Sequence, residues 1–157
     1  MRPTRNAFAA LLVVGMPALL LGAPAQAASK VCKLEISGND AIQYDKQQLK
    51  ISSHCTQAEL TLTHTGKRPA HSMGHDWVLV KAEDLSAVAS DGLTAGVANN
   101  YVKKDDPRVI AHTKIVGGGA STSVTCATAA LKQGQPHEYL RTFPGHNALM
   151  NGAFIIE

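Results

Sequence analysis

The sequence predicts an all-β protein, a sandwich of two sheets with Greek-key connections. Three observations predict this fold class. Apolar and polar residues alternate in short stretches, turn-forming residues separate these stretches, and a pair of cysteines flanks the first two of them. A single segment with helical periodicity interrupts the pattern and is expected to form a short flap.

Residues 1–27 have the layout of a secretory signal peptide. Two arginines precede an apolar run at 7–21, and Ala-Gln-Ala at 25–27 supplies small residues for cleavage. The apolar run is too short to span a membrane. We therefore expect export to the periplasm, no membrane insertion after cleavage, and one mature domain over residues 28–157.

The charge balance excludes two classes of partner. The whole chain has a formal net charge of +3, and two of its 15 basic residues, Arg2 and Arg5, belong to the signal peptide. The mature chain is nearly neutral and contains no cluster of lysine and arginine. Nucleic acids and anionic membranes require a concentrated basic face, so the composition argues against both.

Eight stretches of alternating or apolar residues are the expected strands. They lie at residues 32–36, 49–51, 60–64, 75–79, 109–116, 124–128, 137–141 and 154–156. Turn residues at 38–40, 66–69 and 117–119 separate some of the consecutive expected strands.

Residues 82–102 follow a different pattern. Apolar residues recur there at helical spacing from Leu85 to Ala89, after acidic residues that favour a helix start. We expect a helical flap, inserted between strands and ended by Asp91-Gly92.

The chain has three cysteines, and export should leave an even pair oxidised and an odd one free. Cys32 and Cys55 flank two strand-like stretches, which makes them the natural pair, although spacing alone leaves other pairings open. Closing such a loop stabilises a fold by about 3 kcal/mol in the chain-entropy model. Cys126 lies within a strand, where a buried thiol is expected rather than a metal ligand.

Two histidines and a methionine form the pattern that carries chemistry. His75 lies at a strand start, and His146 and Met150 lie four residues apart in a loop opened by Pro144-Gly145. A trigonal site of two histidines and a cysteine, with a long axial methionine, binds copper and supports electron transfer. The cysteine that would complete this site is absent, because residue 141 is an arginine.

The chain resembles the azurin family, blue copper proteins of the cupredoxin class, over essentially all of its mature length. The resemblance rests on the pair Cys32 and Cys55 and on residues 74–79, 91–92, 100–101, 108–114, 117–119 and 142–150. It implies a cupredoxin β-sandwich, one copper ion, and periplasmic one-electron transfer with a partner such as a c-type cytochrome or a reductase. An enzyme is not expected, because no nucleophile lies beside a base in a recognisable elbow.

The resemblance also assigns roles to residues. His75 and His146 correspond to the two imidazole ligands of the copper. Met150 corresponds to the axial thioether, and Gly74 to the glycine whose carbonyl faces the metal from the other side. Arg141 falls where the family has its thiolate ligand.

Asp76 is, after Arg141, the second residue that differs from the azurin pattern. Azurins have an asparagine at this position, which holds the ligand loop in place. The fold implied by the resemblance places Asp76 next to the loop that begins at Arg141 and Thr142. We expect an ion pair between Asp76 and Arg141 that fills the former copper site. The alternative is that Asp76 is solvated and Arg141 extends outward.

Loss of the thiolate should impair the redox chemistry. Arginine stays protonated and has no acceptor atom, and its charge opposes a copper ion nearby. We therefore expect a copper-binding protein of the one-electron-transfer class with impaired function. The alternatives are a non-redox interaction protein on the same fold, and an error or gene decay, since one base change converts a cysteine codon to arginine.

Four apolar residues are expected to surround His146 and to form a docking face rather than to serve only packing. They are Met73, Phe143, Pro144 and Leu149.

The remaining histidines are weaker candidates for ligands. We expect His64 to be a hydrogen-bonded core residue, because it shares an alternating face with Leu60 and Leu62. His112 is expected at the surface.

Overall fold

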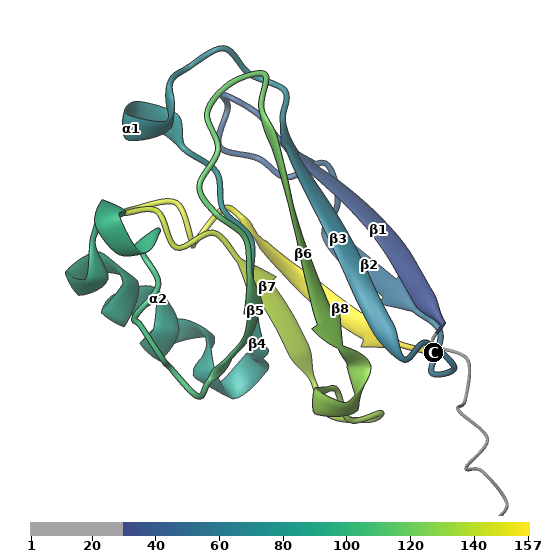
Figure 1. Cartoon of the computed structure of the whole chain (residues 1–157). Coiled ribbons are helices and arrows are strands. Elements are labelled where there is room, and N and C mark those ends of the chain that lie inside the picture. The colour runs from purple at the N-terminus through teal and green to yellow at the C-terminus, as the bar shows by residue number, and fades with distance from the viewer. Residues whose placement is uncertain (1–29) are drawn as a thin grey trace, which may run out of the picture.

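The computed structural model describes residues 30–157, so the predicted signal peptide, residues 1–27, lies outside the described residues. Two sheets face each other, and the helices lie outside them (Figure 1). The prediction of an all-β sandwich is confirmed. No helix within residues 30–157 is long and apolar enough to cross a membrane.

The first sheet has three strands in the order β1-β3-β6. They are β1 (Val31–Gly38), β3 (Gln57–His64) and β6 (Ser121–Ala127). β1 runs parallel to β3, and β6 runs antiparallel to it. Every second residue of β3 is buried, which is the period expected of a strand with one face in the core.

The second sheet has five strands in the order β2-β8-β7-β4-β5. They are β2 (Gln48–Ile51), β4 (Val78–Lys81), β5 (Val109–His112), β7 (His137–Leu140) and β8 (Asn151–Ile156). β2 pairs in parallel with β8, although most of the chain separates the two strands. Neighbours that are distant in sequence are typical of Greek-key connections.

The main core lies between the two sheets. Trp77 is 1% exposed, and its ring centroid lies 6.0 Å from that of Tyr139 and 6.2 Å from that of Phe154. Burial of a large apolar side chain stabilises a fold by roughly 1.5–3 kcal/mol. These aromatic residues therefore anchor the sheet that carries both segments of the candidate site.

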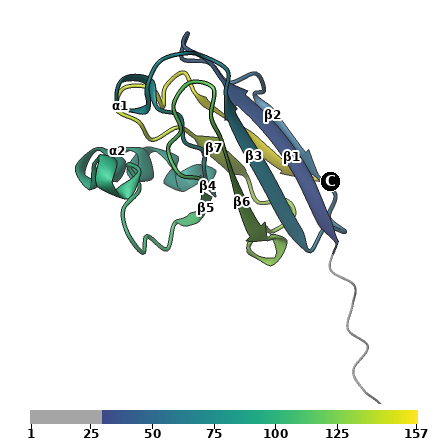
Figure 2. The ribbon, with the colours of Figure 1, turned by 45° about the horizontal axis from the view of Figure 1, so that its top comes forward.

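The helical flap consists of α2 (Leu85–Ala95) between two 3₁₀ turns, η1 (Ala82–Asp84) and η2 (Val97–Asn99). Val88 and Ala89 of α2 pack against residues of β4 and β7 on the outer face of the second sheet. Figure 2 shows α2 beside this sheet. Another 3₁₀ turn, η3 (Thr128–Ala130), follows β6.

The predicted helix end at Asp91-Gly92 is wrong, because α2 continues to Ala95. The helix ends at Gly96, which has a φ of 70° and suits a helix terminus. Gly92 instead permits close packing, since a Cβ atom there would lie 2.4 Å from the carbonyl oxygen of Tyr101.

Two predicted strands are shorter than expected near the candidate site. His75 forms only an isolated bridge with Val116, and β4 begins at Val78. Between these points the hydroxyl of Thr113 accepts the Trp77 amide at 3.0 Å. A side chain therefore replaces a regular ladder bond, and the chain enters the site as an irregular segment.

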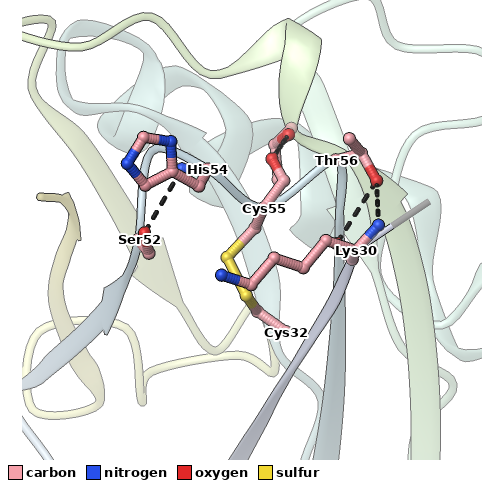
Figure 3. Close-up of a disulfide and its surroundings, with 7 residues drawn as sticks. Lys30, Cys32, Ser52, His54, Cys55 and Thr56 are labelled. Atoms are coloured by element: carbon pink, nitrogen blue, oxygen red, sulfur yellow. Dashed lines mark hydrogen bonds between the residues drawn. A yellow bond between two sulfur atoms is a disulfide. The ribbon is translucent and has the colours of Figure 1, made fainter. Parts of the chain in front are cut away.

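The disulfide Cys32–Cys55 is confirmed, with a Cα–Cα distance of 5.8 Å. It joins the start of β1 to the segment before β3, and the Lys30 amide donates beside it to the Thr56 hydroxyl at 2.8 Å (Figure 3). Cys126 is a free, half-buried thiol. The β3 ladder places Cys126 opposite Ala58, at the end of β3 remote from His64.

Ile42 carries backbone strain in the segment between β1 and β2. Its φ is 59°, a left-handed conformation that a β-branched residue rarely adopts. Ile42→Asn is expected to stabilise the protein by about 1 kcal/mol, because asparagine tolerates this conformation. Chemical denaturation measures the effect, with Ile42→Val as the control that keeps the branched Cβ. Equal stabilities of both variants would argue against strain.

His137 is a buried imidazole outside the candidate site. It pairs with Phe154 on the inner face of the second sheet and is 2% exposed. Within residues 30–157, neither of its ring nitrogens has a hydrogen-bond partner. Burial lowers its pKa below the ordinary 6.5, and the backbone of Gln135 offsets only part of this shift.

We expect His137→Leu to stabilise the protein by about 1–2 kcal/mol near pH 7, because it removes a buried imidazole whose nitrogens make no well-formed hydrogen bond. The unfolded imidazole binds a proton below pH 6.5 more readily than the folded one. The wild type should therefore lose stability as the pH falls through this value, and the variant should lose less. Urea unfolding at several pH values measures both effects, with exposed His112→Leu as control. Parallel pH profiles would contradict this account of His137.

Candidate metal centre

Two segments form the candidate site at the end of the sandwich that carries α1 (Ala70–Met73). The first is α1 with the two residues after it, and the second is the loop between β7 and β8. Figures 1 and 2 both place α1 beside this loop. Gly74 ends α1, where its amide donates to the Ala70 carbonyl at 2.8 Å. A Cβ atom at Gly74 would lie 2.4 Å from this carbonyl oxygen, so the turn requires glycine.

His75 is held as a neutral imidazole. Its Nε2 atom donates to the Asn39 carbonyl at 2.9 Å, which leaves the lone pair on Nδ1. This Nδ1 atom is buried and has no partner among the described residues. Burial, with a contribution from the charge of Arg141, lowers the pKa of His75 to about 3. The ring therefore has the tautomer and charge state of a metal ligand.

The neighbours of His75 fix the orientation of its ring. The ring stacks on His64 with 4.0 Å between centroids. Gly38 leaves room for it, because a Cβ atom there would lie 2.4 Å from Cδ2 of His75. His64 is the predicted core histidine. Its Nε2 donates to the Met73 carbonyl at 2.9 Å, and its Nδ1 accepts the Gly66 amide at 3.0 Å.

The loop from residue 141 to residue 150 presents the second imidazole. The Arg141 amide donates to the Met150 carbonyl at 2.9 Å and closes the loop. Within it, the Met150 amide donates to the His146 carbonyl at 2.9 Å. The His146 ring stacks on Phe143, and its Nδ1 atom is buried without a partner in the described part of the chain. Burial and then the charge of Arg141 lower the pKa of His146.

Arg141 lies in the middle of the predicted ligand set and is 0% exposed. One guanidinium nitrogen donates to the Gly74 carbonyl, and another to Sδ of Met150 at 3.3 Å. The guanidinium carbon lies 4.7 Å from the centroid of the Phe143 ring. Burial lowers the pKa of Arg141 to about 10, which Asp76 and Tyr44 partly oppose, so the side chain stays a cation at neutral pH.

The predicted ion pair between Asp76 and Arg141 is wrong. The ion pairs within residues 30–157 do not include it, and the carboxylate of Asp76 binds Thr142 instead. The Thr142 amide donates to the two carboxylate oxygens at 3.2 and 3.3 Å, and its hydroxyl donates to one of them. Burial raises the pKa of Asp76 to about 6, against these hydrogen bonds. Asp76 is buried, so the solvated alternative is also wrong.

The predicted docking face is only partly exposed. Leu149 is 69% exposed, Pro144 is exposed and Phe143 is half-buried. Met73 is 8% exposed, with its Sδ atom 3.9 Å from a guanidinium nitrogen of Arg141. Its side chain faces inward and is therefore not part of this surface. His112 is exposed, as predicted.

The donor atoms present do not fit a blue copper centre. No group of three or more histidine, cysteine, aspartate or glutamate side chains within residues 30–157 is placed to hold a metal ion. Two unpartnered imidazole nitrogens remain, on His75 and His146. The other two predicted donors, the Gly74 carbonyl and the Met150 thioether, are hydrogen-bonded to Arg141.

Sequence reasoning missed three contributors to this site. Asn39 orients His75 through a backbone carbonyl, and Tyr44 donates its hydroxyl to the Asp76 carbonyl. A backbone acceptor leaves no signal in the residue type. Gly38 was interpreted as a turn residue, and only the fold shows that it makes room for the His75 ring.

Known proteins are similar to this chain in sequence and in fold. The family described as copper binding proteins, plastocyanin/azurin family, matches residues 30–157. The chain therefore belongs to the plastocyanin/azurin family of copper-binding proteins, and its fold is a cupredoxin-like β-sandwich.

Individual relatives are azurins. Azurin-1 of Alcaligenes xylosoxydans xylosoxydans is 49% identical over 121 residues, which cover 77% of this chain and 94% of that protein. Azurin of Bordetella pertussis is 45% identical over 140 residues, covering 89% of this chain and 93% of that protein. A solved structure of the azurin Az-iso2 from Methylomonas sp. strain J is similar, with a TM-score of 0.78 and 36% identity. The match covers 80% of this chain and 98% of that one.

Proposed function

We propose that the mature chain is a periplasmic, azurin-like protein of the copper-binding, one-electron-transfer class whose redox function is impaired. The observation that supports copper binding is the pair of buried, unpartnered Nδ1 atoms on His75 and His146. Buried polar atoms without a partner are uncommon in proteins. Neutral imidazole nitrogens are good copper ligands.

The impairment follows from the residue at position 141. We assign Arg141 to the position of the azurin ligand cysteine, and its guanidinium donates to two of the other predicted donors. A thiolate would supply an anionic charge and a strong soft bond to copper. Arginine supplies neither, and its positive charge repels a second cation in a buried site. Copper bound here is held weakly by imidazoles, and the protein is a poor electron carrier.

We further propose that the protein meets its partner through the exposed apolar surface of Pro144, Leu149 and the edge of Phe143. Small apolar faces of this type are used in weak electron-transfer encounters. The azurin resemblance implies a c-type cytochrome or a reductase as partner. We assign the protein no catalytic residue and no enzymatic activity.

Copper titration of the metal-free protein against a chromophoric chelator tests the proposal. We expect weak binding of one copper ion, reduced by about tenfold or more in His75→Ala and in His146→Ala. The control His112→Ala removes an exposed histidine of β5 that is not a predicted ligand, and this variant should bind copper like the wild type. Copper binding that is unchanged in both ligand variants would contradict the proposal.

A second candidate function is a non-redox interaction protein that keeps the fold and the apolar surface. The contacts of Arg141 favour it, because the guanidinium satisfies the Gly74 carbonyl and the Met150 sulfur without a metal. Copper analysis of protein isolated from the periplasm of copper-supplied cells separates the two functions. Bound copper favours the first, and its absence, together with no affinity in the titration, favours the second.

A further inference from the structure

The Arg141 side chain connects three parts of the site that are separate in the sequence. It reaches the Gly74 carbonyl directly after α1, Sδ of Met150 directly before β8, and the ring of Phe143 within the loop. A second sulfur, Sδ of Met73, lies 3.9 Å from the same nitrogen that contacts Met150. All these acceptors are neutral and electron-rich, so a single cation holds them together.

In a metalloprotein a metal ion holds separate segments together, because this central cation binds neutral donors from each of them. The guanidinium has the same sign of charge and five N–H groups in a fixed planar arrangement. Among the described residues near it, the polar atoms without a partner are the Nε–H donor of Arg141 itself and two acceptors, Nδ1 of His75 and Nδ1 of His146. The carbonyl and the thioethers are therefore already satisfied without an ion.

We propose that Arg141 is a built-in structural cation, which takes the place of the metal and assembles the loop from residue 141 to residue 150 in the metal-free protein. Copper then competes with the guanidinium for the Gly74 carbonyl and the Met150 thioether. The first statement concerns the metal-free chain and does not depend on the proposed function. The second rests on the copper binding proposed above.

The guanidinium can be observed directly in metal-free protein by ¹⁵N NMR. We expect the Nη protons of Arg141 to exchange slowly near neutral pH, with no change on addition of EDTA. Arg68 is exposed and serves as the internal reference for fast exchange. Fast exchange of Arg141, equal to that of Arg68, would overturn the proposal even if every variant failed to fold.

Variants test whether this cation assembles the loop. In metal-free Arg141→Met, which keeps length but removes the charge, the amides of residues 141 and 150 should exchange about tenfold faster or more than in the wild type. In Arg141→Lys the exchange rates of these two amides should lie between those of the wild type and Arg141→Met, because lysine keeps the charge but has no planar set of donors. The control Arg108→Met removes an arginine outside the site and should leave both amides protected. Unchanged exchange in Arg141→Met would overturn the structural role.

Copper titration tests the competition separately. Arg141→Met should bind copper about tenfold more tightly than the wild type, although it gains no thiolate. Equal measurable affinities would overturn the competition. If neither protein binds copper, the proposed function fails, while slow guanidinium exchange still supports the structural cation.

Discussion

Arg141→Cys is expected to turn the protein intensely blue with Cu(II) and to raise its copper affinity by at least about a hundredfold. The substitution restores an anionic sulfur ligand, whose charge transfer to Cu(II) produces the colour. It also removes the cation that opposes copper and frees the Gly74 carbonyl and the Met150 thioether. Absorption spectroscopy and competition titration measure the two effects.

The matched control for this variant is Arg141→Ser. Serine also removes the cation, but it has no sulfur, so copper should bind more tightly than in the wild type without intense colour. Asp76→Asn can be combined with Arg141→Cys to remove a carboxylate that could itself bind copper. If the double variant stays colourless, the loop has lost its ligating geometry, and the non-redox function is favoured.

Asp76→Leu is expected to lower the free energy of unfolding by about 2–3 kcal/mol. The carboxylate is the acceptor for both the amide and the hydroxyl of Thr142, and all these groups are buried. Leucine leaves the two donors unpaired and separates the loop from the segment that carries His75. Chemical denaturation of metal-free protein measures the loss.

The matched variant is Asp76→Asn, which should cost less than about 1 kcal/mol. Its amide oxygen can accept the Thr142 amide, and its NH₂ group can donate to the Thr142 hydroxyl. The negative charge contributes less than these hydrogen bonds, because burial raises the pKa of Asp76 to about 6. The charge acts on Arg141 only across a distance, where it raises the pKa of the guanidinium without forming an ion pair. A large loss in Asp76→Asn would show that the negative charge itself stabilises Arg141.

The fold was largely predictable because its signals are local. Apolar and polar residues alternate in residues 60–64 because one face of this strand is buried. The odd number of cysteines indicated that one would be free, and Cys126 is the free one, whereas Cys32 and Cys55 form the disulfide. Gly92 shows where such signals fail. Glycine is a common helix breaker, yet here it lies within α2 because the Tyr101 backbone approaches too closely for any side chain.

The site was less predictable, because side-chain direction depends on tertiary contacts. The opposite charges of Asp76 and Arg141 suggested an ion pair. In the structure the carboxylate instead accepts the Thr142 amide, and the guanidinium donates to the Gly74 carbonyl. Met73 is expected from the sequence to belong to the docking face around His146. Its sulfur lies instead next to Arg141, a contact that no sequence pattern indicates.

The most direct test of the central claim is the spectrum of the wild-type protein titrated with Cu(II). If a guanidinium stands where the thiolate would be, the solution should stay nearly colourless. Electron paramagnetic resonance should then show only a weak, nitrogen-dominated copper signal, which is lost when His75 and His146 are both replaced by alanine. An intense blue colour would contradict the account, because among residues 30–157 only Cys126 has a free thiol, at the other end of β3.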